Sequence, residues 1–449
     1  MNWNQSQKQS QKLTRQRLKA IKHTLSRKEL KAHLGEAMET RYCKRVPIEL
    51  AIWFVVGVGM FSSDTYRQVF RWLVPLGTAI PGSSTLTEVR KRVGSRLMRQ
   101  LYHSVVRRLG TAVNQVGFYK GLQLMGVDGF TLSLFDSPEN RREFGRPKNR
   151  RTWGPYPQTR CVALAELGTH VLWRTAIGKY HEGEQTLIRR LFEHLKAGML
   201  VLMDRNLLSF EIAHEVTGRN AQFLIRCKSN RVLPVLRRLQ DGSYLSRIYA
   251  SQYDQQKDRN GLDVRVIEYT LDDPDRAGCD ELHRLVTSLL DEQQHAAREL
   301  IVLYHQRWEQ ELAFDEFKTH LRQRPVLRSQ RPDGVRQEIY ALLISHFIIR
   351  KIAFDASRMA GVKPTRISFQ ATFKIFRSKL AEVAIIGSIA KWYQLIVAEA
   401  AREVIPPRSG RINPRVLKKT TSAWTRKRDK HRKPKQPKTS FEDSIVMLV

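Results

Sequence analysis

Cysteine and long apolar runs are both scarce in this chain. Its 449 residues include four cysteines, which lie far apart without a Cys-x-x-Cys pair, so neither a disulfide framework nor a zinc site is expected. The longest apolar run, residues 48–61, is shorter than the roughly 20 residues that span a bilayer, and no signal-peptide core is visible. The sequence therefore predicts a protein of a reducing cytosol, away from membranes.

Acidic residues are also few. Forty-three Asp and Glu against 78 Lys and Arg leave a net charge of +35, which predicts a polyanionic partner. A soluble protein with basic tails is the alternative.

No Gly-x4-Gly-Lys-Ser/Thr loop is present, so nucleotide hydrolysis is not indicated. The 41% of apolar residues excludes a wholly disordered chain. Four histidines without regular ligand spacing are expected to be structural or exposed: His170, His181, His194 and His214.

Changes of pattern along the chain predict its organisation. Short β-like runs that alternate with helical stretches indicate an α/β fold. The domains expected in chain order are a basic arm over 1–35, a helical DNA-binding domain over 36–120, the first part of a catalytic domain over 121–228, a β-rich insertion over 229–288, the second part of the catalytic domain over 289–370, C-terminal helices over 371–405, and a basic, disordered tail over 406–449.

Within these domains, several helices are predicted. Thr85 and Glu88 form a capping-box pattern ahead of a basic helix over 86–109. A second helix is expected over 181–197, and residues 291–320 are expected to form one long helical stretch.

The segment from Tyr304 to Leu321 contains the most informative side chains. At about 100° per residue, Tyr304, Arg307, Glu311 and Lys318 fall on one stripe of a helix, and Trp308 lies beside it. Leu303, Phe314, Phe317 and Leu321 fall on a neighbouring face, which should pack on the sheet. The simpler interpretation is that Arg307 and Glu311 form an ordinary i,i+4 ion pair.

Two aspartates follow apolar runs, Asp128 after residues 124–127 and Asp204 after residues 199–203. An acid at the end of a buried strand is costly unless it is paired or binds a metal. Asp128-Gly129 could instead be a hairpin turn, and Asp204 could be a helix N-cap. Together with Glu311, the two aspartates supply what a two-metal phosphoryl-transfer site requires. On so basic a chain, this predicts phosphodiester cleavage and strand transfer.

These residues resemble a known family. Tyr304, Arg307, Glu311 and Lys318 reproduce the Tyr-x2-Arg-x3-Glu-x6-Lys signature of DDE transposases of the insertion-sequence-four (IS-four) family. The resemblance covers roughly residues 30 to 405. It includes the segments DGFTLSLFDSPENRREFGRP, MDRNLLSF, VIEYTLDDP with LVTSLLD, PIELAIWFVVGVGMF with TYRQVFRWL, and ISFQATFKIFR.

The resemblance implies a fold and a set of site residues. The fold would be a ribonuclease-H-like catalytic core with a β-rich insertion, flanked by helical domains. Asp128, Asp204 and Glu311 would be the catalytic triad that binds two Mg2+ ions, for which Mn2+ can substitute. The transposon end would be held by Tyr304, Arg307 and Lys318, with Trp308 stacking or packing nearby.

The resemblance also implies an activity. The protein would bind the ends of an insertion sequence in double-stranded DNA, cleave them by metal-dependent hydrolysis and transfer the 3′-OH ends into target DNA. A dimer is expected in the synaptic complex, in a prokaryotic cytoplasm and associated with the nucleoid. A catalytically inactive, DNA-binding remnant or domesticated transposase is the alternative, and metal-dependent strand cleavage would distinguish the two.

Overall fold

A computed structural model describes residues 46–74, 78–148, 153–228, 230–274, 278–279, 281–386, 388–406 and 438–448. The chain divides into two compact units. Unit 1 contains the described residues up to Leu200 and those of Arg307–Ile405, and unit 2 contains the described residues of Val201–Gln306 and of the segment after Ile405. The basic N-terminal arm and most of the basic tail that the sequence predicts lie outside the described residues.

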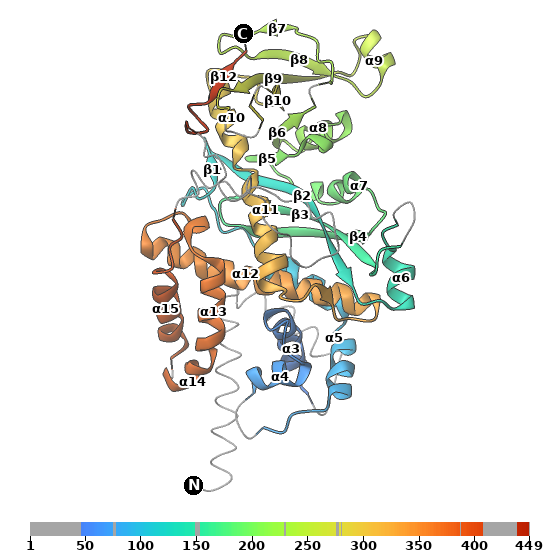
Figure 1. Cartoon of the computed structure of the whole chain (residues 1–449), viewed down its shortest axis with the longest axis vertical. Helices are drawn as coiled ribbons and strands as arrows, with labels where there is room; N and C mark the ends of the chain where they lie inside the picture. The colour runs from blue at the N-terminus through green and yellow to red at the C-terminus, as the bar shows by residue number, and fades with distance from the viewer. Residues whose placement is uncertain are drawn as a thin grey trace. The chain divides into compact units, whose positions relative to one another are not determined.

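The helices of unit 1 pack around one long, buried helix. Figure 1 shows that helix, α12 (Pro332–Ala360), which contacts α3 (Ile48–Met60) and α5 (Ser83–Val105). α3 is apolar on nearly every side, so it is stable only when buried. Gly59 allows the two backbones to touch, because a Cβ atom there would lie 2.5 Å from the carbonyl group of Ala341. The remaining α-helices described in unit 1 are α4 (Tyr66–Leu73), α6 (Pro138–Phe144), α7 (Glu184–Arg189), α11 (Trp308–Asp315), α13 (Phe369–Lys379), α14 (Val383–Ile386) and α15 (Ile389–Ala400).

An antiparallel sheet forms the other layer of unit 1. Its order is β4 (Val171–Lys179), β3 (Gln158–Glu166) and β2 (Leu122–Leu134). β1 (Phe118–Tyr119) pairs antiparallel with β2, and β11 (Val326–Leu327) pairs parallel with it. The β-like runs predicted in this part of the chain are therefore strands, although β2 continues beyond the run that was expected to end at Asp128.

Asp128 lies in the middle of β2, which corrects the prediction that it ends a strand. It pairs with Ala163 of β3, so Asp128-Gly129 is not a hairpin turn either. The physical reason lies in the residues that follow. Phe130, Leu132 and Leu134 continue an alternation of buried and more exposed side chains, which is typical of a strand and overrides the two-residue turn signal.

The predicted long helix over 291–320 is also wrong, because the structure interrupts it. α10 (Ala297–His305) belongs to unit 2, whereas α11 and a π-helical segment, Glu316–Leu321, belong to unit 1. Between the helices, the amide of Gln306 donates to the carbonyl three residues earlier, which is tighter than the i,i+4 bonding of an α-helix. A single stripe at a constant angle per residue therefore does not apply across this segment.

Two other predicted helices differ in their ends. The helix expected over 86–109 with a Thr85 cap begins at Ser83, and Gly82 at its N-cap has no side chain to make a capping bond. It also bends at Gly94, whose φ of 67° leaves the helical region. The helix expected over 181–197 is reduced to α7 and one short turn of 3-10 helix.

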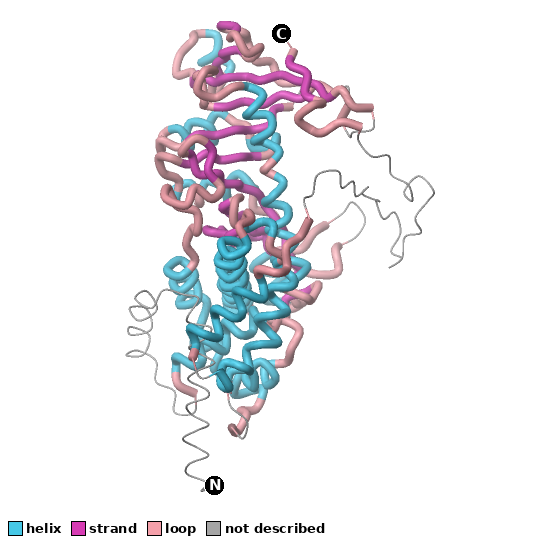
Figure 2. Tube along the Cα trace, turned by 90° about the vertical axis from the view of Figure 1, so that its left-hand side faces the viewer, coloured by secondary structure: helices cyan, strands magenta, loops and turns pink. Residues whose placement is uncertain are grey.

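Unit 2 is dominated by antiparallel strands, which lie side by side in Figure 2. β5 (Met199–Met203) leads the chain from unit 1 into unit 2. β12 (Ile445–Met447) pairs with β9, so the end of the tail predicted to be disordered is part of a sheet. Beyond β5 the strands follow the order β6 (Gln222–Cys227), β10 (His283–Thr287), β9 (Leu262–Leu271), β8 (Tyr244–Ile248) and β7 (Arg237–Arg238), with the helices α8 (Phe210–Thr217), α9 (Gln252–Gln256) and α10.

None of the helices in the described part of the chain combines the length and the apolar character that a membrane crossing requires.

Candidate active site

Within unit 1, β2 and α11 bring Asp128 and Glu311 to the same guanidinium group. Arg307 Nη1 lies 3.7 Å from Asp128 Oδ2, and Arg307 Nη2 donates to Glu311 Oε1 at 3.2 Å. All three side chains are partly exposed. The structure therefore places two of the three predicted acids, distant in sequence, around one positive charge that solvent can reach.

A glycine and a glutamine allow this approach of α11 to the sheet. Gly126 precedes Asp128 by two residues on β2, and a Cβ atom there would overlap Gln310 Oε1. Gln310, the residue before Glu311, is 1% exposed, and its Nε2 donates to the carbonyl of Ala163 at 2.9 Å. Sequence reasoning missed both positions. The only available signals were a glycine inside a strand pattern and a glutamine between two glutamates.

The predicted apolar face is confirmed for α11 and the π-helical segment, whereas Leu303 of the same predicted face lies in α10 of unit 2. Phe314 and Phe317 are buried, and both rings contact Phe130 of β2, with centroid separations of 4.6 and 5.6 Å. Leu321 is buried as well. Because these rings hold the helix on the sheet, Glu311 is fixed by the core beneath it.

Unit 2 contains two of the predicted site residues, one from the triad and one from the signature. Asp204 follows β5 directly, as the sequence predicts. It precedes a short 3-10 turn, Arg205–Leu207, and within this described segment its side chain makes no capping hydrogen bond. The hydroxyl group of Tyr304 donates to the carbonyl of Met203 at 3.0 Å, so α10 is bonded to the strand end that presents Asp204.

The remaining predicted site residues lie on the surface of unit 1. Trp308 begins α11 and is 44% exposed, which is unusual for a tryptophan. Lys318 is partly exposed in the π-helical segment. A π-helical turn has more residues than an α-helical turn, and such segments are frequent at functional sites. The constant 100° per residue that placed Lys318 on the stripe of Glu311 therefore does not hold over this segment.

The described residues contain no group of three or more His, Cys, Asp or Glu side chains arranged to hold a metal ion. The donors of unit 1 nevertheless suit a hard divalent cation, because Asp128 and Glu311 offer carboxylate oxygens. Both already lie against one positively charged group, Arg307. This donor set fits Mg2+ or Mn2+ better than a softer metal, for which thiolates or imidazoles would be expected.

Comparison with known protein families assigns the chain to a class. The family described as "Transposase DDE domain" matches residues 121–348, about half of the sequence. A second family, "Insertion element 4 transposase N-terminal", matches residues 16–103. The chain therefore belongs to the DDE transposases, and within them to the insertion-sequence-four family.

The chain is also similar to individual proteins. The chain is similar to the "Transposase InsG for insertion sequence element IS4" of Escherichia coli (strain K12), with 26% identity over 387 residues, 84% of this chain and 86% of the relative. It is also 26% identical to the "Putative transposase InsZ" of the same organism, over 36% of this chain and 54% of that relative. A solved structure of the piggyBac transposase synaptic complex with hairpin DNA aligns with a TM-score of 0.45 and 10% identity, covering 86% of this chain and 81% of that one.

These findings confirm several predictions made from the sequence. The family, the activity of a DNA transposase and the enzyme class are as expected. The fold class, an α/β catalytic domain of the ribonuclease-H-like type flanked by helices, agrees with the mixed strands and flanking helices of the structure.

Proposed function

We propose that this transposase cleaves the ends of its insertion sequence by metal-dependent hydrolysis, with Asp128, Asp204 and Glu311 as the metal-binding triad. The observation that supports this most strongly is the convergence of Asp128 and Glu311 on Arg307. Two carboxylates held around one cation form a place where a divalent ion can replace the guanidinium. Asp204 belongs to unit 2, where the hydroxyl group of Tyr304 is hydrogen-bonded to the end of the strand that precedes it.

The reaction proposed for this site has two stages. Two Mg2+ ions, held by the three carboxylates, would polarise the scissile phosphate and lower the pKa of the attacking water. Hydrolysis would free a 3′-OH group, which would then be the nucleophile in later in-line transfers, through a hairpin on the transposon end. Positioning and charge stabilisation dominate such phosphoryl transfers, so the chain needs no covalent intermediate.

The cationic and aromatic residues of the site are proposed to hold the DNA. The guanidinium of Arg307 pairs with phosphates as readily as with carboxylates, so it can turn to the DNA backbone when the triad binds metal. Lys318 and Tyr304 would contact the same backbone, and exposed Trp308 offers a surface on which a base can stack. The net charge of +35 supports DNA as the partner.

The assembly and location are proposals of the same kind. Joining two transposon ends requires at least a dimer in the synaptic complex. The bacterial relatives support a prokaryotic cytoplasm, where the protein would associate with the nucleoid.

The decisive experiment is cleavage of a labelled duplex that carries the element's terminal repeat. Wild type and Glu311→Ala are compared in Mg2+ and in EDTA, with end binding followed by mobility shift. We expect Mg2+-dependent nicking in wild type only, with end binding retained in both proteins. Tight binding by wild type without cleavage in Mg2+ or Mn2+ would instead identify an inactive, DNA-binding remnant.

A further inference from the structure

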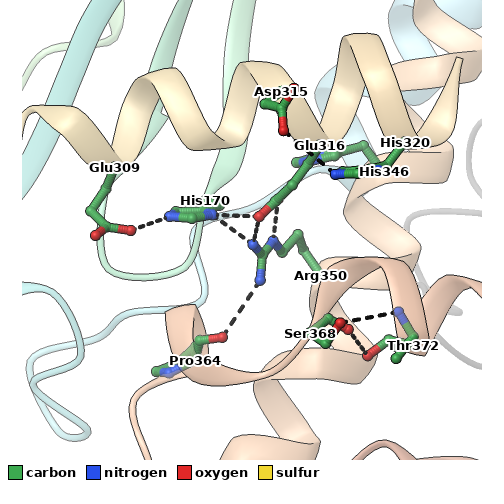
Figure 3. Close-up of polar contacts among 11 residues, drawn as sticks. His170, Glu309, Asp315, Glu316, His320, His346, Arg350, Pro364, Ser368 and Thr372 are labelled. Atoms are coloured by element: carbon green, nitrogen blue, oxygen red, sulfur yellow. Dashed lines mark hydrogen bonds and ion pairs between the residues drawn. The ribbon is translucent and has the colours of Figure 1, made fainter. Parts of the chain in front are cut away.

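A buried histidine joins two acidic residues on the helical segment that carries Glu311. His170 lies in the turn between β3 and β4, is 1% exposed and has a φ of 61°. Its Nε2 atom lies 2.6 Å from Glu309 Oε2, and its Nδ1 atom lies 2.8 Å from Glu316 Oε1. Figure 3 shows the imidazole ring between these two carboxylates. The sequence predicted only a structural or exposed histidine here.

The two carboxylates flank Glu311 in sequence and lie on the opposite side of the helix. Glu309 precedes Glu311 by two residues, which is about 200° around an α-helix. Glu316 is seven residues after Glu309, about two turns along nearly the same face. The ring of His170 therefore contacts one side of the segment, and Glu311 faces Arg307 and Asp128 from the opposite side. A rotation of α11 about its axis would break these contacts of His170 and move Glu311 away from Asp128.

At its inner end, this arrangement is anchored in the core of unit 1. Arg350 of α12 donates from Nε to Glu316 Oε2 at 2.7 Å and also bonds Oε1 of the same carboxylate. His346 Nε2 lies 3.3 Å from Oε2. Burial alone would raise the pKa of Glu316, but the charges of Arg350 and then His170 hold that pKa well below its usual range. Glu316 is thus an ionised anchor, and its removal would leave Arg350 uncompensated.

At its outer end, the arrangement is more open. The Glu309 side chain is 29% exposed, whereas that of Glu316 is 8% exposed. Substitution of Glu309 therefore removes one contact of His170 without leaving an uncompensated charge in the core. Asp315 is a suitable reference, because it is an acid at the end of the same helix, is 55% exposed and lies near His320 rather than His170.

We propose that His170 and Glu309 are positioning residues for the catalytic glutamate: their contact fixes the rotation of α11, so that Glu311 and Asp128 present their carboxylates to the metal together. The inference rests on the proposed role of Glu311. Residues that orient metal ligands, without touching the metal, typically change metal affinity or activity by about 10- to 100-fold when substituted. Small displacements of a reacting group have comparable effects on rate.

The test compares wild type, Glu309→Ala, Glu309→Gln and Asp315→Ala, each as the full chain bound to its terminal-repeat duplex. Mn2+ binding is measured from the free-ion signal in electron paramagnetic resonance. Cleavage is followed in single turnover at several Mg2+ concentrations, and thermal unfolding reports stability. His170→Ala is added as a second, more severe change, because it removes the ring that contacts both carboxylates.

We expect Glu309→Ala to weaken Mn2+ binding about tenfold and to raise the Mg2+ concentration for half-maximal cleavage by a similar factor. DNA binding and the Tm should stay near those of wild type. Asp315→Ala, which removes an equal charge from the same helix, should behave as wild type. Glu309→Gln should restore most of the loss, because its amide oxygen can still accept a hydrogen bond from His170.

The proposal is overturned if Glu309→Ala and Asp315→Ala bind Mn2+ equally well. It is also overturned if the loss in Glu309→Ala follows a lowered Tm and is not restored by glutamine, since that outcome describes a structural role alone. Failure of the proposed function gives a different result: wild type would not cleave, and Glu311→Ala would bind Mn2+ as wild type does.

Discussion

Among the places in unit 1 where an arginine lies beside acidic side chains, two differ in burial and in geometry. Arg307 bridges Asp128 and Glu311 at 3.7 and 3.2 Å, and all three side chains are partly exposed. Arg350 is held by Glu316 through two bonds in the core, with His170 completing the set. Solvent reaches the first arrangement, whereas the second is enclosed in the core. An ion pair that solvent reaches can thus exchange its partners, whereas a buried ion pair can hold a helix in a fixed position.

The largest expected effect is on stability, at the buried pair. Arg350→Ala leaves the ionised Glu316 without its main partner, so we expect a loss of about 3–5 kcal/mol in the free energy of unfolding. Arg190→Ala, which breaks an exposed pair with Glu182, should cost about 0–1 kcal/mol. Urea denaturation of both variants measures the difference. Equal costs would contradict the contrast between buried and exposed pairs.

The next effect concerns the approach of α11 to the sheet. Gly126→Ala places a methyl group against Gln310 Oε1, so we expect a loss of about 1–3 kcal/mol from overpacking, together with slower cleavage. Adding Gln310→Ala should relieve part of that loss, because the side chain that the methyl group meets is then absent. A double-mutant cycle in urea gives the coupling, and strictly additive costs would refute the contact.

A third prediction concerns the stability of the protein at low pH, and its sign follows from the lowered pKa of Glu316. A carboxyl group with a folded pKa below its ordinary 4.5 contributes stability that is complete above that value and is lost as the pH falls through the folded pKa. The free-energy difference between wild type and Glu316→Gln should therefore be greatest near neutral pH and shrink below about pH 4.5. Denaturation at several pH values tests this. A difference that grows in acid would reverse the sign and exclude an ionised Glu316.

The smallest effect is expected at the exposed pair. Arg307→Gln should change the free energy of unfolding by less than about 1 kcal/mol. If Arg307 turns to a phosphate, the slope of log Kd for the terminal-repeat duplex against log salt should fall by about one. Trp308→Ala, the matched change at the next residue, should weaken binding without altering the slope. An unchanged slope in Arg307→Gln would show that its guanidinium stays with the carboxylates when DNA is bound.

The fold was largely predictable where local pattern decides it. Short β-like runs located β2, β3 and β4, and an apolar run located α3, because the apolar side chains of each element are buried when it packs. Two errors came from local signals that longer-range packing overrides. Asp128-Gly129 resembles a turn but continues β2, and the stretch expected to be one helix changes its hydrogen bonding at Gln306 without a proline or glycine to mark the change.

The candidate site was predictable in its residue types and spacing rather than in its neighbours. The signature spacing identified Arg307 and Glu311, and the strand pattern identified Asp128, yet nothing local indicated that one guanidinium would contact both acids. Gln310 was missed, and His170 was predicted to be structural or exposed without its partners, for the same reason. Each looks ordinary in sequence and gains its meaning from a partner far away in the chain, on β3 for Gln310 and on α11 for His170.

The sequence by itself determined the net charge of +35, the class of transposase, and the chemistry available to the site, because charge and donor type belong to each side chain wherever it lies. Only the tertiary structure decided which carboxylates share Arg307 and which are tied by His170 and Arg350. Those contacts join β2, the β3–β4 turn, α11 and α12, elements brought together by burial of the apolar faces between them. Electrostatic partners depend on distance in space, which local sequence pattern does not encode.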